Sequence, residues 1–211
     1  MSDLLMPPMA PSPPASPPAP GLPWGTPGDS SPGWMYRLNE KYISQWDFYK
    51  YDRMTKMCYS TKNGDSFSSD VWHSKCNGKG ATIWFANTMT SGKLYVAGGY
   101  TRNTWAGGGY SSDSYAHLFH FNHAKQGWVT KAGSGPHAGS NYAIYRSNGY
   151  GPTWGNAHDW YVTSNMKTGY NNLGYAYKCR IGNYGQNACQ IDFFGSYSSW
   201  SIAEAEMWSE N

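Results

Sequence analysis

The chain has 211 residues and a mass of 23.5 kDa, which is enough for one domain and a tail. Only 14% of its residues are charged, and 11 Trp, 18 Tyr and 25 Gly make it rich in aromatic and turn residues, which favours a β-rich domain. The formal net charge is +3, and its lysines and arginines are scattered, so a nucleic-acid-binding protein is disfavoured. No apolar stretch predicts a membrane span, and the N-terminus lacks the pattern of a signal peptide.

Residues 1–33 form a proline-rich arm of low complexity. Proline locks φ and lacks an amide donor, so this arm is predicted to be polyproline II, serving as a stiff linker or as a ligand for an aromatic groove. Its Ser-Pro-Pro repeats resemble, in composition, the hydroxyproline-rich arms of algal and plant wall glycoproteins, where Ser and modified Pro carry O-glycans. The corresponding candidates for arm contacts or glycan attachment are Pro11, Ser12, Pro13, Pro14, Ser16, Pro17 and Pro18.

Residues 34–211 are predicted to form one domain of many short strands with Gly-rich turns, a two-sheet β-sandwich with short flanking helices. The first twenty of these residues fit a short helix or a strand pair equally well. Further along, Ala81–Ala86 and Lys93–Ala97 predict a hairpin in the interior of a sheet, and Gly98 and Gly99 mark a place where backbones approach closely. The other expected elements are a strand at 57–60, a helical turn at 69–76, and strands at 117–121, 141–146, 192–197 and 200–208.

The stretch from Gly151 to Tyr177 predicts two strands that meet at tight turns, followed by an alternating Tyr-Ala-Tyr run. His158 and Asp159 lie at the corner between the two strands. Adjacent strand side chains point to opposite faces, so this pair cannot form a catalytic dyad. Asp159 is expected to accept backbone N–H bonds at the turn.

The four cysteines, Cys58, Cys76, Cys179 and Cys189, include no Cys-x-x-Cys pair, which argues against a zinc site. Cys179 and Cys189 flank a Gly-Asn loop, so they are expected to form a local disulfide, and Cys58 with Cys76 would close another loop. Four reduced, buried thiols are the alternative. The low-charge composition favours disulfides and an oxidising compartment.

The tryptophan surplus predicts a binding surface, because exposed aromatic rings stack on sugar rings or on proline rings. The alternative is that most of these rings fill the core. The candidates are Trp105, Trp128, Trp154, Trp160 and Trp200, with the loop residues Trp105 and Trp128 expected at the surface.

The polar residues predict no catalytic centre, and no cofactor is expected. Glu204 and Glu206 share one face of a predicted strand and are expected to be solvated or salt-bridged rather than to bind a cation. The spacing of His117, His120 and His123 does not place them on one strand face, so they are expected, with His137, to be structural rather than metal ligands.

Four segments, in order, resemble the TLDc domain of the eukaryotic oxidation-resistance proteins, from about Met57 to Trp208. Gly98 and Gly99 belong to a segment like the family's strand ending in Gly-Gly-Tyr. Gly155 and Asp159 belong to one like its Gly-Pro, aromatic, Gly and Asp segment. Glu204 and Glu206 belong to one like its closing strand. The segments themselves are MCYSTKNGDSFSSDVWHSKCNGKGATI, KLYVAGGYTRNTW, GPTWGNAHDWYV and FFGSYSSWSIAEAEMW.

The resemblance implies a β-sandwich with a binding role, no cofactor and no catalytic centre. This chain is less charged than many intracellular members and is closer to variants of protist and algal multidomain proteins. Two functions follow as hypotheses. One is an extracellular or cell-surface structural module, a homo-oligomer or polymer in which the proline-rich arm docks head to tail on an aromatic groove, with possible carbohydrate contact. The other is an intracellular regulator, which by the resemblance would bind the vacuolar proton-pumping ATPase in oxidative-stress protection. A glycan hydrolase lacks the expected carboxylate motif.

Overall fold

A computed structural model describes residue 54 and residues 56–90, 93–121, 127–136, 139–194 and 199–210. The proline-rich arm with its candidate residues, and residues 34–53, expected to form a short helix or a strand pair, lie outside this part. Within the described part the chain is mostly β, with eleven strands and two α-helices. The predicted β-rich architecture with short helices is therefore confirmed.

All strand pairs are antiparallel and belong to one sheet, whose order is β4-β7-β8-β9-β10-β11-β2-β3-β5-β6, with β1 pairing to β11. The strands are β1 (Lys56–Ser60), β2 (Thr82–Thr90), β3 (Lys93–Thr101), β4 (Gly109–Ser111), β5 (His117–Phe121), β6 (Gly127–Lys131), β7 (Ile144–Arg146), β8 (Thr153–Trp154), β9 (Trp160–Val162), β10 (Thr168–Asn171) and β11 (Ser199–Ser209).

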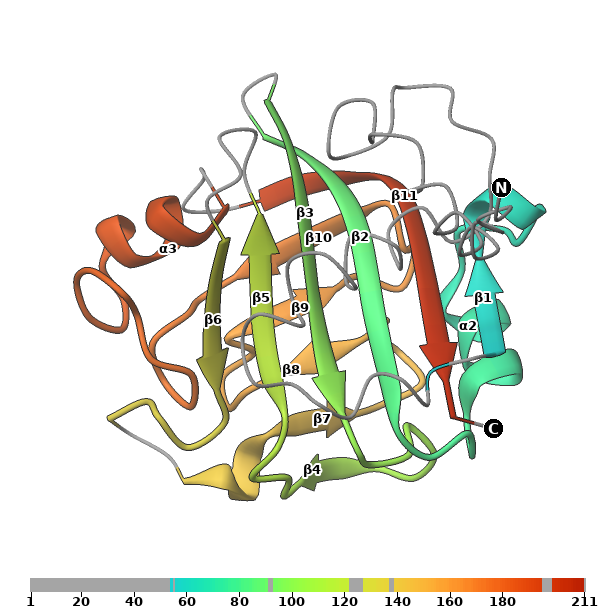
Figure 1. Ribbon diagram of the computed structural model, residues 1–211, viewed down its shortest axis with the longest axis horizontal. Helices are drawn as coiled ribbons and strands as arrows, with labels where there is room; N and C mark the ends of the chain where they lie inside the picture. Colours follow the sequence, from blue (N-terminus) through green and yellow to red (C-terminus); the bar gives the residue numbers. More distant parts are fainter. Residues whose placement is uncertain are drawn as a thin grey trace, which may run out of the picture.

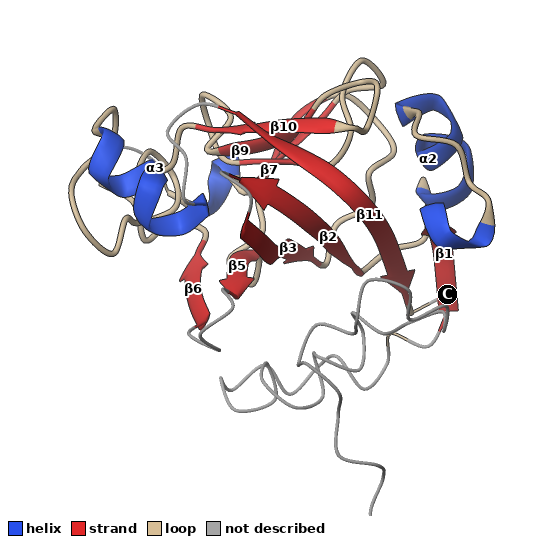
Figure 2. Ribbon diagram, turned by 90° about the horizontal axis from the view of Figure 1, so that it is seen from above, coloured by secondary structure: helices blue, strands red, loops and turns tan. Residues whose placement is uncertain are grey.

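The long strand β11 turns this single sheet into two layers. Its first residues pair with β10, its last residues pair with β1, and its other edge pairs with β2. The register shifts between Ile202 and Glu204, and such a bulge bends a strand and increases its twist. As a result, a back layer of β4 and β7–β10 lies against a front layer of β2, β3, β5, β6 and β11 (Figures 1 and 2).

Indole rings fill the space between the layers. Trp154 stacks on Trp160 with centroids 4.8 Å apart, and Trp160 lies 5.6 Å from Trp200. Trp105 meets the edge of Trp154 at 5.1 Å. Gly99 of β3 makes room for this row, because a Cβ there would lie 2.6 Å from the Trp154 ring. The close approach expected at Gly99 is thus to an indole ring rather than to another backbone.

The interpretation of Trp105, Trp154, Trp160 and Trp200 as surface residues is wrong, since at most 2% of each is exposed. Trp154 of β8 and Trp160 of β9 are paired across the two strands and both are buried. Trp105 belongs to a loop, but its indole N–H donates to Thr82 Oγ1 at 2.9 Å, which holds the ring inside. Trp128 lies in β6, and its side chain is outside the described part.

Two disulfides form, as the cysteine spacing predicted, and they tie α2 (Ser69–Cys76) to the sheet and α3 (Asn187–Phe194) to the loop that precedes it. Cys58 of β1 bonds to Cys76 of α2, and Cys179 bonds to Cys189 of α3. The helices lie at opposite ends of the sandwich (Figure 2). All four cysteines are disulfide-bonded, so the alternative of four reduced thiols is wrong.

Several predicted strands take another form. Asp192 and Phe193, expected at the start of a strand, belong to α3, and the part of 141–146 before Ile144 lies largely in a 3-10 turn (Ser140–Tyr142). The Tyr175–Tyr177 run is not a strand and contributes one isolated bridge, between Tyr177 and Ala132. By contrast, the β2–β3 hairpin is confirmed and extends beyond its predicted ends.

Candidate functional site

The corner between β8 and β9 is built around the buried carboxylate of Asp159. One oxygen accepts the N–H of Tyr175 at 2.7 Å, and the other accepts the N–H groups of Ala176 at 2.7 Å and Tyr177 at 3.3 Å. The expectation that Asp159 binds backbone N–H groups is confirmed. Its donors lie sixteen to eighteen residues further along the chain, so the carboxylate closes a long loop rather than a local turn.

The carboxylate of Asp159 is enclosed by the backbone of the corner, and both of its oxygens already accept hydrogen bonds. Gly155 has a φ of 80°, and a Cβ there would lie 2.1 Å from a carboxylate oxygen, so only glycine fits. Ala157 and His158 also take left-handed φ values, of 53° and 58°, which cost energy for residues with a Cβ. Burial raises the pKa of Asp159 to about 7, while the backbone N–H bonds act to lower it. The arrangement is an anchor for residues 174–177.

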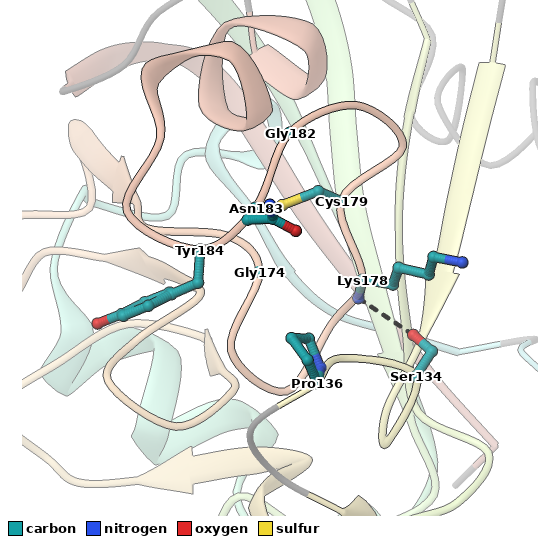
Figure 3. A pocket seen from close by; sticks show the side chains of 8 residues that line it. All are labelled: Ser134, Pro136, Gly174, Lys178, Cys179, Gly182, Asn183 and Tyr184. Atoms are coloured by element: carbon teal, nitrogen blue, oxygen red, sulfur yellow. Dashed lines mark hydrogen bonds between the residues drawn. The ribbon is translucent and has the colours of Figure 1, made fainter.

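A hollow of about 200 Å³ lies beside the Cys179–Cys189 disulfide, next to this anchored segment (Figure 3). Lys178 and Tyr184 stand on opposite sides of it, and the backbone N–H of Lys178 donates to Ser134 Oγ at 3.1 Å. No carboxylate or histidine is among its described lining residues, so it holds no acid–base pair. The lining is formed by Ser134, Pro136, Gly174, Lys178, Cys179, Gly182, Asn183 and Tyr184.

A row of aromatic rings crosses the outer face of the back layer. We define the tyrosine ladder as Tyr110 of β4, Tyr145 of β7, His158 of the corner, Tyr161 of β9 and Tyr170 of β10. Strand alternation creates it, because Ile144 beside Tyr145 and both strand neighbours of Tyr161 are buried core residues, while these two tyrosine rings face outward.

The rungs of the tyrosine ladder follow one another at nearly constant spacing. The ring centroids are 4.9 Å apart for Tyr110 and Tyr145, 5.2 Å for Tyr145 and His158, 5.1 Å for His158 and Tyr161, and 5.3 Å for Tyr161 and Tyr170. This matches the distance of about 4.8 Å between neighbouring strands. Tyr110 is 37% exposed and Tyr170 40% exposed, and the three rings between them are half-buried.

The tyrosine ladder carries no formal charge at neutral pH. Burial raises the pKa of Tyr110 and of Tyr161, so both phenols stay protonated. Burial also lowers the pKa of His158, which keeps its imidazole neutral. The ladder therefore presents ring faces and hydroxyl groups, suited to an uncharged partner.

Sequence reasoning looked for such a surface in the tryptophans and missed the tyrosines. The signal was present in the strands themselves, because Tyr145 follows Ile144 and Tyr161 lies between Trp160 and Val162. In each case alternation sends the apolar neighbour inward and the phenol outward. The pairing of β4 with β7 and of β9 with β10 then brings these tyrosines together.

The acidic and histidine candidates form no site. Glu204 pairs with Lys62 at 3.3 Å, as expected of a salt-bridged carboxylate, whereas Glu206 is only 2% exposed. His117 and His120 face opposite sides of β5, and His123 and His137 lie outside the described residues. Among the residues that the structure describes, no group of three His, Cys, Asp or Glu is placed to hold a metal ion. The same part of the chain contains no helix able to span a membrane.

No family model matches the sequence, and no curated protein matches it significantly.

Because His120 is buried, we expect the free energy of unfolding to decrease as the pH falls. Its ring stacks on Phe193 at 4.6 Å, and burial lowers its pKa from 6.5 to about 3, with Asp192 opposing and Arg180 adding to the shift. A lowered pKa in the folded state means that the unfolded chain binds the proton first, so stability is lost as the pH falls from about 6.5 toward 3. The loss approaches about 1.4 kcal/mol for each pH unit.

Urea unfolding of the wild type and of His120→Phe between pH 7 and pH 4 measures this contribution. We expect the difference in unfolding free energy between the two proteins to shift in favour of the variant as the pH falls. The raised pKa of Asp159 acts in the opposite direction in both proteins and cancels in this difference. Parallel pH profiles would show that His120 is not the group responsible.

Proposed function

We propose that this protein is a non-catalytic structural and binding module of the cell surface or extracellular space, related to the TLDc domain. In this proposal the tyrosine ladder binds the proline-rich arm of another copy, so that copies assemble head to tail. The observation that carries the proposal is the evenly spaced, uncharged row of rings from Tyr110 to Tyr170.

The arm and the ladder agree in length. Polyproline II rises about 3.1 Å per residue, so a ladder of about 20 Å would accept roughly six or seven residues of such a helix. Residues 7–20 contain several overlapping stretches of this length. A polyproline II helix makes no internal hydrogen bonds, so its carbonyl groups are free to accept from tyrosine hydroxyls while proline rings pack on the ring faces.

The arm and the ladder also agree in charge. Residues 7–20 consist of Pro, Ser, Ala and Met and carry no charged side chain. An uncharged peptide that binds an uncharged row of rings leaves no ion desolvated, so binding does not carry the cost of burying an unpaired charge. A contact between the arm of one copy and the ladder of the next uses two different surfaces, so it is heterologous and can continue into a filament.

The two disulfides support the extracellular placement, since such bonds persist in oxidising compartments and are rare in the cytosol. They count against the alternative proposal, an intracellular TLDc regulator of the vacuolar proton-pumping ATPase, because a cytosolic protein would keep its cysteines reduced. A sugar stacked on the same rings would be a carbohydrate contact at the same site.

Self-association of the full chain tests the proposal. Sedimentation velocity over a range of concentrations should show assembly of the wild type and at least a tenfold weaker assembly of the double variant Tyr145→Ala, Tyr161→Ala, because each ring contact contributes about 1 kcal/mol. Replacing Pro13, Pro14, Pro17 and Pro18 by alanine should weaken it similarly. Tyr115→Ala is the matched control, because Tyr115 is 48% exposed and lies outside the ladder. Equal assembly of wild type and double variant would contradict the proposal.

A further inference from the structure

The front layer buries side chains on both of its faces. Trp84, Ala86, Ala97 and Leu118 belong to the core between the layers. The residues that alternate with them point the other way, and the register Ile83 to Tyr100 and Phe85 to Gly98 to Phe119 places them together on one surface. We call this surface the outer front face, formed by Ile83, Phe85, Val96, Tyr100 and Phe119.

The outer front face is as buried as the core, although it lies outside the core cluster. Ile83, Phe85 and Phe119 are 0% exposed, Val96 is 1% exposed and Tyr100 is 3% exposed. The back layer lies on the opposite side of these strands, the two helices lie at the ends, and no helix or strand of the described ranges crosses this face (Figures 1 and 2). Met89, further along the same side of β2, is 43% exposed, so the cover ends before it.

We propose that residues 34–53 of the same chain cover the outer front face. These residues directly precede β1, which pairs with β11 beside β2. Met54, the last residue before this junction that the structure describes, is 0% exposed. The segment can bury a large apolar area against this face because it is rich in aromatic side chains. It has seven of them, Trp34, Tyr36, Tyr42, Trp46, Phe48, Tyr49 and Tyr51.

The segment is long enough in any conformation. Twenty residues extend to roughly 65 Å as a strand and about 30 Å as a helix. The four strands β11, β2, β3 and β5 span only about 15 Å, at about 4.8 Å from each strand to the next. Residues 34–53 can therefore cross the face from the β1 side without help from the arm.

The charges agree with this assignment. Glu206 of β11 pairs with Phe85 of β2, so it stands on the same surface, and it is 2% exposed. A carboxylate is buried at an acceptable energy only beside a cation or several donors. The segment supplies Arg37, Lys41, Lys50 and Arg53, and one of these cations is assigned to Glu206.

Nuclear Overhauser contacts in the full-length protein test the proposal directly. With methyl-labelled Ile83 and Val96, we expect contacts to aromatic protons of residues 34–53 in the same molecule. A one-to-one mixture of labelled and unlabelled copies separates the possible occupants. Contacts between a labelled and an unlabelled copy would overturn the proposal and show that a second molecule covers the face. Methyl signals broadened by a soluble paramagnetic agent would overturn it by showing that the face is exposed to solvent.

A substitution pair provides the second measurement. Changing Trp46 and Phe48 to serine in the full chain should lower Tm by roughly 10 °C or more and raise the binding of a hydrophobic dye several-fold. The control Trp24→Ser lies in the arm and should shift Tm by no more than about 2 °C. Equal Tm and dye binding in all three proteins would overturn the proposal. The result is independent of self-association, so it does not depend on the proposed function.

Discussion

Replacing Asp159 by alanine is expected to lower the free energy of unfolding by about 4 kcal/mol. The substitution removes the acceptor of three backbone N–H groups, those of Tyr175, Ala176 and Tyr177. The donors of Ala176 and Tyr177 are buried, and each buried donor left without an acceptor costs about 1–3 kcal/mol. A cavity beside Gly155, which now packs against the carboxylate, adds to the loss.

Two further variants distinguish the loss of the Asp159 hydrogen bonds from the general effect of removing a negative charge. Asp159→Asn keeps the shape but offers one acceptor oxygen, so we expect a loss of about 2 kcal/mol. Asp70→Ala removes an exposed carboxylate at the start of α2 and should cost less than about 1 kcal/mol. Chemical denaturation of the three variants measures these values. Equal stability of Asp159→Ala and Asp70→Ala would mean that the buried carboxylate does not hold residues 174–177.

Reducing both disulfides is expected to destabilise the fold by about 6 kcal/mol. Cys58–Cys76 has a sequence separation of 18 and Cys179–Cys189 one of 10. A bond that closes a loop of this length lowers the conformational entropy of the unfolded chain, which stabilises the folded state by about 3 kcal/mol for each bond. A loss of this size is comparable to the whole stability of many domains, about 5–15 kcal/mol.

Guanidinium unfolding with and without a thiol reductant measures the total, and the pairs Cys58→Ala, Cys76→Ala and Cys179→Ala, Cys189→Ala divide it. The first pair of substitutions should also loosen α2, whose His73 hydrogen-bonds to the carbonyl of Tyr150, in the loop between β7 and β8, at 3.0 Å. If the reduced protein unfolds within 1 kcal/mol of the oxidised one, the disulfides are dispensable and the intracellular alternative gains support.

The features that could be predicted from the sequence are those that depend on patterns of neighbouring residues. The β2–β3 hairpin, the corner at Gly155–Asp159 and the disulfide pairs each follow from turn residues, alternation or short spacing. Asp159 was correctly given a structural role because an aspartate at a turn commonly accepts backbone N–H bonds. Its actual donors, beyond residue 174, were not predictable, since long-range partners depend on how the strands meet.

The tryptophans show what only the tertiary structure decided. Trp105 and Trp154 belong to segments far apart in the chain, yet their rings meet because the bulge in β11 folds the front layer onto the back layer. Composition shows that aromatic side chains are abundant, but it does not show which face of a strand will be covered.

The sequence by itself determined a β-rich chain with a proline-rich arm, closed locally by turns and disulfides, because these depend on neighbouring residues. Only the tertiary structure assigned Trp105, Trp154, Trp160 and Trp200 to the core and the tyrosines of the ladder to the surface. The tyrosines of the ladder come from β4, β7, β9 and β10. Tyr110 of β4 and Tyr145 of β7 are far apart in the sequence and become neighbours only when these two strands pair.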